Sequence, residues 1–183
     1  QARLVFDSVD LHYLRERRAA ELAGSARLLR AAERTRALEL DVINSADVTL
    51  VVSEAERSLL STDAPAAQVE VVSNIHEVVG AGLPFEQRRG LVFVGGFRHP
   101  PNVDAVCWFV ESVFPLVRTR LPDADFHCIG GELTPEVEAL SSRDGVHVHG
   151  YVPDIVPYMD GCRIAVAPLR YGAGVKGKIN LSM

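Results

Sequence analysis

The regular alternation of strand-like and helix-like segments after residue 90 constrains the fold of this chain more than any other feature. Four short runs of mostly aliphatic and aromatic residues, at 91–94, 126–129, 146–148 and 164–167, are typical of strands in a buried sheet. Segments of helical composition separate them, at 103–120, 135–141 and 154–159. Strands that alternate with helices over short loops indicate βαβ units. The sequence therefore predicts an α/β fold with a doubly wound parallel sheet.

The first 75 residues contain a second set of elements. We expect strands at 4–6, 48–52 and 69–72, and a strongly helical stretch from about 11 to 45 that is rich in Ala, Leu, Arg and Glu. Gly24 and Ser25 interrupt this stretch, and glycine in a helix costs about 1 kcal/mol relative to alanine. The stretch is therefore one bent helix or two. Ser53, with Glu56 three residues later, forms the capping-box pattern that begins another helix.

Residues 76–89 hold Gly80, Gly82 and Pro84 and show little periodicity, as a connection between two domains does. The predicted organisation is the end of one domain at 1–75, a connection at 76–89 and an α/β domain at 90–183. The chain opens on Gln1 and stops at Met183 where a helix is starting. We therefore expect it to be a fragment of a longer parent.

Composition narrows the possible functions. A net charge of −5 and a pI near 5.7 argue against a general attraction to nucleic acid or anionic lipid, so phosphate binding requires a local site. The three cysteines are far apart in apolar segments, which is typical of buried hydrophobic residues in a reducing cytosol. No apolar run approaches the ~20 residues that span a bilayer. We expect a cytoplasmic protein, and membrane association of the parent stays open.

The loop at 95–102, between a strand and a helix, is the first candidate site. Ligands of open α/β sheets bind beyond the carboxyl ends of the strands, where helix N-termini and glycine-rich turns offer backbone N–H groups. Gly95 and Gly96 allow close approach of the backbone to a ligand, and Arg98 adds charge for a phosphate. A tight turn with Pro101 in the first turn of the helix explains the same residues without a ligand.

The loop at 168–178 follows the last predicted strand and is the second candidate. Gly172, Gly174, Lys176 and Lys178 make it suitable for an anionic diphosphate. Of the 19 basic residues in the chain, 17 are arginine, and the two lysines both lie in this loop. This placement favours a requirement for compact ammonium groups rather than for positive charge in general. The alternative is a solvated basic turn.

The loop at 150–154 is a weaker candidate. Backbone groups around Val152 could form hydrogen bonds with the edge of a nucleobase. The simpler interpretation is an ordinary loop in which Asp154 caps the next helix. His147 and His149 alternate with valines, so both face the same side of a strand. With no third ligand nearby in the sequence, we expect no metal site.

Near the N-terminus, Asp10 and His12 follow a predicted strand and are the candidate catalytic residues. The competing interpretation is that Asp7 or Asp10 caps the following helix.

Three segments, 93–102, 150–152 and 167–178, together resemble in order and spacing the donor-binding half of retaining GT-B-type glycosyltransferases, the family 4-like or group 1 enzymes. The earlier stretches 10–12 and 46–54 resemble the end of the acceptor-side domain of such enzymes. The resemblance covers essentially the whole chain. It implies that 90–183 is a Rossmann-like domain that binds a nucleotide sugar.

The resemblance implies an enzyme that binds a nucleoside-diphosphate sugar between two Rossmann-like halves. It would transfer the sugar, with retention of configuration, to a carbohydrate, lipid-linked or other small acceptor. The family normally needs no metal or other cofactor, because basic residues neutralise the leaving diphosphate, a role that falls here to Lys176 and Lys178. With most of the acceptor half absent, we expect the fragment alone to be inactive.

One departure from the family pattern concerns the end of the chain. In many members a glutamate begins a helix turn that reads like Glu-Ala-Met. At the same place this chain has Leu181-Ser182-Met183. An alternative function is a non-catalytic nucleotide-binding or structural α/β domain. A dinucleotide-binding domain is disfavoured, because no Gly-x-Gly-x-x-Gly follows the strand at 91–94.

Overall fold

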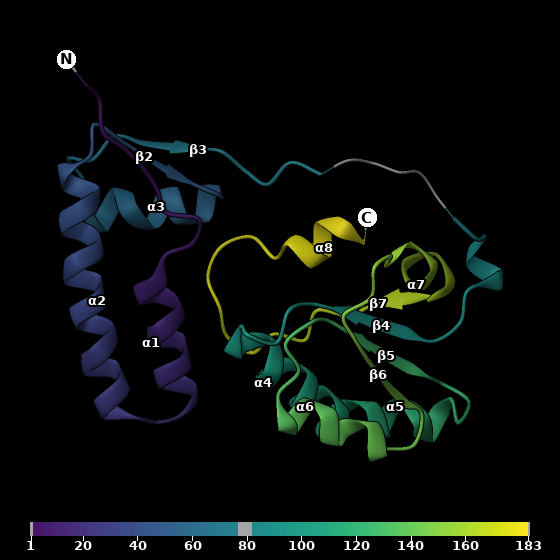
Figure 1. The fold of residues 1–183 in the computed structure, drawn as a ribbon. Helices are drawn as coiled ribbons and strands as arrows, with labels where there is room; N and C mark the ends of the chain where they lie inside the picture. Colours follow the sequence, from purple (N-terminus) through teal and green to yellow (C-terminus); the bar gives the residue numbers. More distant parts are fainter. Residues whose placement is uncertain (1, 77–81, 183) are drawn as a thin grey trace. The chain divides into compact units, whose positions relative to one another are not determined.

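The structure is a computed structural model that describes residues 2–76 and 82–182 (Figure 1). It divides into two compact units. Unit 1 holds the described chain up to Ile75 together with Tyr171–Val175, and unit 2 holds the other described residues. Residues 77–81 of the predicted connection, with Gly80, lie outside the described residues. No helix in the described ranges is both long and apolar enough to cross a membrane.

Unit 1 contains a three-stranded parallel sheet and three helices. The sheet order is β1-β2-β3, with β1 at Val5–Asp7, β2 at Val48–Val51 and β3 at Val69–Val71. The helices are α1 (His12–Leu22), α2 (Ala26–Ser45) and α3 (Glu54–Asp63). Gly24 separates α1 from α2 with a φ of +60°, a left-handed conformation that glycine adopts without steric cost. The predicted helical stretch is thus two helices.

The cap predicted for α3 is present. The hydroxyl of Ser53 accepts a hydrogen bond from the backbone N–H of Glu56 at 3.3 Å. The Glu56 carboxylate accepts in turn from the Ser53 hydroxyl and from the backbone N–H of Val52, one residue before the position that a capping box predicts. Glu56 is 3% exposed, so these bonds compensate the burial of its carboxylate.

Unit 2 is built on a four-stranded sheet in the order β6-β5-β4-β7. The strands are β4 (Leu91–Val94), β5 (Phe126–Ile129), β6 (Val146–Gly150) and β7 (Ile164–Ala165). Each neighbouring pair is parallel, which confirms the prediction that the carboxyl ends of these strands lie at one edge of the sheet.

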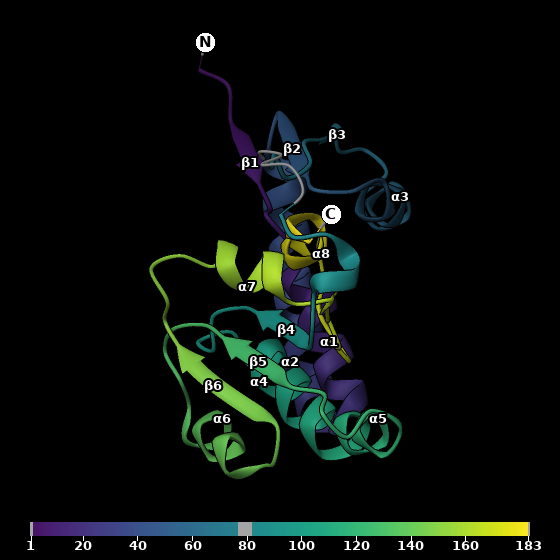
Figure 2. The ribbon, with the colours of Figure 1, turned by 90° about the vertical axis from the view of Figure 1, so that its right-hand side faces the viewer.

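Helices cover both faces of this sheet. The helices of unit 2 are α4 (Pro100–Trp108), α5 (Phe114–Arg120), α6 (Pro135–Ala139), α7 (Val156–Gly161) and α8 (Gly177–Leu181), and single 3-10 turns cover Phe85–Gln87 and Leu140–Ser142. Figure 2 shows α5 and α6 on one side of the strands and α7 on the other. Alternate strand residues enter different cores, with Phe93 in one and Val92 in the other. The doubly wound α/β prediction is confirmed.

The helix predicted at 103–120 differs in detail. The helical segment begins earlier, at Pro100, and a wide π-helical turn at Phe109–Val113 separates α4 from α5. Pro115 lies just after this turn. A proline has no N–H to donate to the carbonyl four residues earlier, and its ring clashes there, so the wider turn accommodates it.

Candidate functional site

The loops that follow β4 and β5 lie side by side at the carboxyl edge of the sheet in unit 2. The backbone N–H of Gly95 donates to the carbonyl of Ile129 at 2.9 Å, and that of Phe97 donates to Gly131 at 3.0 Å. These bonds extend the β4–β5 pairing beyond the strands and hold the Gly95–Gly96 turn in place. In a parallel sheet this edge is where ligands bind.

Lys178 of α8 lies against this turn. Its Nζ donates a hydrogen bond to Oδ1 of Asn102 at 3.2 Å and lies 5.3 Å from the centre of the Phe93 ring. The side chain is partly buried, and this burial, followed by the charge of Lys176, lowers the pKa of Lys178. The ammonium group is therefore held in a site that water only partly solvates, where an anion would interact with it more strongly than at the open surface.

Asn102, in the first turn of α4, connects Lys178 to the turn. It is 5% exposed, and its Nδ2 donates to the backbone carbonyl of Gly96 at 2.7 Å. The sequence pattern does not single out Asn102 as a site residue. A signal for it exists, because an asparagine directly after Pro100 and Pro101 at a helix start is placed to bond the preceding loop.

The two glycines of the turn differ in what surrounds them. A Cβ atom on Gly95 would lie 2.9 Å from Nδ2 of Asn102 and 3.2 Å from the Phe93 ring, whereas a Cβ on Gly96 would meet nothing within 4 Å. The absence of a side chain at Gly95 is explained by packing inside the protein. Gly96 borders open space, so it is the glycine that leaves room for a ligand.

Gly130, which the sequence pattern does not single out either, is required for the close approach of the two loops. A Cβ there would lie 2.0 Å from the carbonyl oxygen of Gly95. Its backbone N–H donates to Gly150 at the end of β6. A Gly-Gly pair directly after a strand and before a helix is the signal for it, since the same pattern marks Gly95.

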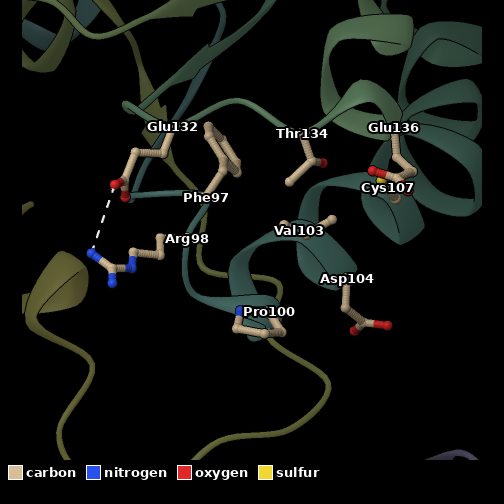
Figure 3. Close-up of a pocket in the computed structure, with 9 residues that line it drawn as sticks. All are labelled: Phe97, Arg98, Pro100, Val103, Asp104, Cys107, Glu132, Thr134 and Glu136. Atoms are coloured by element: carbon tan, nitrogen blue, oxygen red, sulfur yellow. Dashed lines mark ion pairs between the residues drawn. The ribbon is translucent and has the colours of Figure 1, made fainter.

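Arg98, in the same loop, has a side chain that is exposed to solvent. Its side chain is 86% exposed and lies 3.9 Å from the carboxylate of Glu132, a separation at which an exposed ion pair contributes little. Both residues border an open surface cavity of about 660 Å³ (Figure 3). The other residues that line it are Phe97, Pro100, Val103, Asp104, Cys107, Thr134 and Glu136.

The surroundings of Val152 and Lys176 give no direct indication of a ligand. Val152 is partly buried and packs against the core of Val92, Ile129 and Cys162. The helix predicted to follow Asp154 begins two residues later, at Val156, so Asp154 is not the residue next to its first turn. The Asp154 carboxylate nevertheless accepts a hydrogen bond from the backbone N–H of Val156 at 2.9 Å. Lys176 immediately precedes α8.

Gly172 and Gly174 belong to unit 1. Their φ angles of +149° and +67° explain why glycines stand there. The carbonyl of Gly172 accepts a hydrogen bond from Arg18, and the N–H of Gly174 donates to the buried Glu56 at 3.1 Å. These backbone groups therefore have protein partners within unit 1. Their assignment to phosphate binding stays a prediction.

Asp10 and His12, the predicted catalytic residues, are neighbours in unit 1. His12 Nδ1 lies 3.2 Å from Glu39 Oε1 and 3.5 Å from Asp10 Oδ1, and the imidazole is 52% exposed. Asp10 also pairs with Arg15. Asp10 does not cap α1. Glu39 of α2 does, by accepting hydrogen bonds from the backbone N–H groups at the start of α1. Two carboxylates beside one imidazole can orient it for proton transfer.

His147 and His149 face the same side of β6, as predicted, and a third histidine lies beside them. His127 of β5 is the register partner of His147, and the two rings stack with centres 5.0 Å apart. Strand pairing brings His127 alongside, although it is far from both residues in the sequence. Within the described residues, no group of three or more His, Cys, Asp or Glu side chains is arranged to hold a metal ion.

The structure thus brings together Gly95, Gly96 and Lys178 of the predicted site residues, and adds Asn102 and Gly130. A partly desolvated ammonium group beside a glycine turn at the carboxyl edge of a parallel sheet is suited to an anionic group such as a phosphate.

Comparison with solved structures supports the fold. A mutant of TarM from S. aureus, in complex with Fondaparinux, alpha-GlcNAc-glycerol and UDP, matches 72% of this chain with a TM-score of 0.59 and 14% identity. Sucrose-phosphate synthase from Thermosynechococcus elongatus matches 94% of it with a TM-score of 0.61 and 15% identity. The chain spans 27% and 45% of these two proteins, respectively. The α/β architecture thus matches part of GT-B glycosyltransferase structures.

A comparison with curated proteins finds no match. A family model described as glycosyl transferases group 1 matches residues 88–183, which is just over half of the chain and includes the whole sheet of unit 2 and the Gly95, Asn102 and Lys178 cluster. By this match, the chain belongs to the group 1 glycosyl transferases.

Proposed function

We propose that unit 2 binds the diphosphate of a nucleoside-diphosphate sugar beside Lys178, and that the whole protein transfers this sugar to an acceptor with retention of configuration. Membership in the group 1 family supports the reaction class. A UDP-containing structure of similar fold supports a nucleotide diphosphate as the ligand to test. The observation that carries the proposal is the partly buried ammonium of Lys178, held by Asn102 beside the open side of Gly96.

The electrostatics of Lys178 favour an anionic ligand. Burial lowers the pKa of this lysine, which means that the folded protein destabilises the charged ammonium relative to water. A diphosphate placed next to it would offset this cost through charge-assisted hydrogen bonds. Lys176 would add a second positive charge. During transfer, both would stabilise the charge that develops on the leaving diphosphate, so we propose no metal cofactor.

The other predicted residues have proposed roles of their own. The Val152 loop would contact the nucleobase through its backbone, and Arg98 would add charge at the edge of the site. Asp10 and His12 would act on the sugar or the acceptor, since the two carboxylates that flank His12 keep its imidazole oriented. The proposed acceptor is a carbohydrate, a lipid-linked sugar or another small molecule.

Calorimetry with UDP and GDP tests the diphosphate site. We expect Lys178→Ala to weaken nucleotide binding by roughly 10- to 100-fold, because a charge-assisted hydrogen bond contributes about 1.5–3 kcal/mol. The matched control is Arg120→Ala, which removes an exposed positive charge from the end of α5 and should leave the affinity within about twofold. Equal affinities for both variants would place the phosphate elsewhere.

Transfer is tested on the whole protein. Incubation with nucleotide sugars and candidate acceptors, followed by proton NMR of the anomeric signal of the product, reports both activity and stereochemistry. Retention is expected. Tight binding of nucleotide without transfer to any acceptor would favour the alternative, a nucleotide-binding domain that is not catalytic.

A further inference from the structure

Asn102 uses both ends of its buried side-chain amide. Nδ2 donates to the carbonyl of Gly96 at 2.7 Å, and Oδ1 accepts from Nζ of Lys178 at 3.2 Å. A carbonyl oxygen can only accept and an ammonium group can only donate, so the two neighbours leave the amide one orientation. At 5% exposure, water offers little competition for either bond.

The bond to Asn102 restricts a side chain that is otherwise free to rotate. Lysine has four rotatable side-chain bonds and loses more conformational entropy than most side chains when it is ordered. The Phe93 ring supports Lys178 from one side, at 5.3 Å from Nζ, but a ring face gives a weak directional preference. The directed contact comes from Oδ1 of Asn102.

We propose that Asn102 is a positioning residue of the diphosphate site, which holds Nζ of Lys178 and the Gly96 turn in one fixed relation before the nucleotide binds. This rests on the proposed function of Lys178. Pre-ordering both groups removes part of the entropy that binding would otherwise cost. Asn102 thereby links the loop after β4 to α8, 76 residues further along the chain.

The amide is chemically specific in this position. An aspartate would still accept from Lys178, but its second oxygen would face the carbonyl of Gly96 without a proton to donate, and its charge would compete with the phosphate. A leucine would offer neither bond and would leave the Gly96 carbonyl without its buried partner. A purely structural asparagine, by contrast, would need only the bond to Gly96.

The lysine composition of the chain makes the coupling measurable without a ligand. Lys176 and Lys178 are the two lysines in the sequence, so ¹³C-lysine labelling gives two Cε signals, and Lys178→Ala assigns them. In Asn102→Asp we expect the pKa of Lys178 to rise, because an anionic partner stabilises the ammonium. An unchanged Lys178 titration in folded Asn102→Asp overturns the proposal.

A double-mutant cycle with UDP provides the functional readout. We expect Asn102→Ala to weaken UDP binding by about 5- to 30-fold in the otherwise unsubstituted chain, and by less than about twofold in the Lys178→Ala variant. Two residues that act together show such non-additive effects. Thermal unfolding of each variant, followed by Trp108 fluorescence, confirms that unit 2 is folded. If Asn102→Ala is unstable, Asn102→Ser replaces it in the cycle.

The outcomes separate this inference from the proposed function. If Lys178→Ala lowers affinity but the effects of the two substitutions add, Asn102 is structural and the inference fails while the diphosphate site stands. If Lys178→Ala leaves UDP binding unchanged, the diphosphate site itself fails, and the Asn102 role in it falls with it. Non-additive losses together with a shifted Lys178 titration support both.

Discussion

Nδ1 of His127 in β5 lies 2.9 Å from Nε2 of His149 in β6, so one of the two imidazoles donates a hydrogen bond to the other. Tyr158 of α7 packs against both rings, and its hydroxyl lies 3.4 Å from Nδ1 of His149. Protonation of both rings would replace this bond with a repulsion between two positive charges. The pair therefore favours the neutral form of at least one ring.

The stability of unit 2 should fall as the pH is lowered through about 6.5. Burial, followed by the neighbouring imidazoles, lowers the pKa of His127 and His149 from the usual value near 6.5. The unfolded chain therefore binds more protons than the folded chain just below pH 6.5. The free energy of unfolding decreases as the pH drops through this range, whereas above it both histidines are neutral in the folded and the unfolded chain and the free energy does not change on their account. Urea unfolding monitored by Trp108 fluorescence between pH 8 and 5.5 measures this, and the pH dependence should shrink in His127→Gln. Equal slopes in both proteins would contradict it.

Gly95 and Gly96 should respond differently to alanine. In Gly95→Ala the new Cβ would press on Asn102 and Phe93, so we expect a loss of about 1–3 kcal/mol in the free energy of unfolding, as for overpacked cores. Gly96→Ala meets open space and should stay within about 0.5 kcal/mol of the parent. Urea unfolding followed by Trp108 fluorescence compares them. A Gly96→Ala variant that is the less stable of the two would show that the turn is packed differently.

Glu39 should stabilise unit 1 by capping α1 from a different helix. Its carboxylate is 8% exposed and accepts from the backbone N–H groups of His12 and Tyr13, both at 2.9 Å. Glu39→Ala leaves these donors without their partner, and we expect a cost of about 1–3 kcal/mol. Glu33→Ala, at an exposed position on the same helix, is the control and should change little. Urea unfolding followed by far-ultraviolet circular dichroism gives both values, and similar results for the two variants would argue against the cap.

Arg98 should contribute less to nucleotide binding than Lys178. Its side chain is 86% exposed, and an exposed charge gains little from a ligand because water screens it, so Arg98→Ala should weaken UDP binding by at most about threefold. Raising the salt concentration should remove most of this difference, while the effect of Lys178→Ala persists. Calorimetry at low and high salt distinguishes them. A larger loss for Arg98→Ala would move the main phosphate contact to the loop after β4.

Local sequence patterns predicted most of the elements, and tertiary packing modified their ends. The strand at 91–94 appears with the predicted bounds because its apolar run has no polar break. The strand predicted at 164–167 is shorter, Ile164–Ala165, since β7 pairs only with the first half of β4. The helix predicted at 103–120 contains Pro115, whose missing N–H required a wide turn that composition alone did not predict.

The sequence by itself determined the parallel α/β architecture, because alternating apolar strands and helices with short connections leave few other ways to bury their apolar faces. It also marked Lys176 and Lys178, through the contrast with 17 arginines. Only the tertiary structure decided that Lys178 meets Asn102, that Gly95 is packed while Gly96 is open, and that His127 stands beside His149. These pairings depend on the order and register of β6-β5-β4-β7 and on where α8 lies, which long-range packing sets and no local pattern encodes.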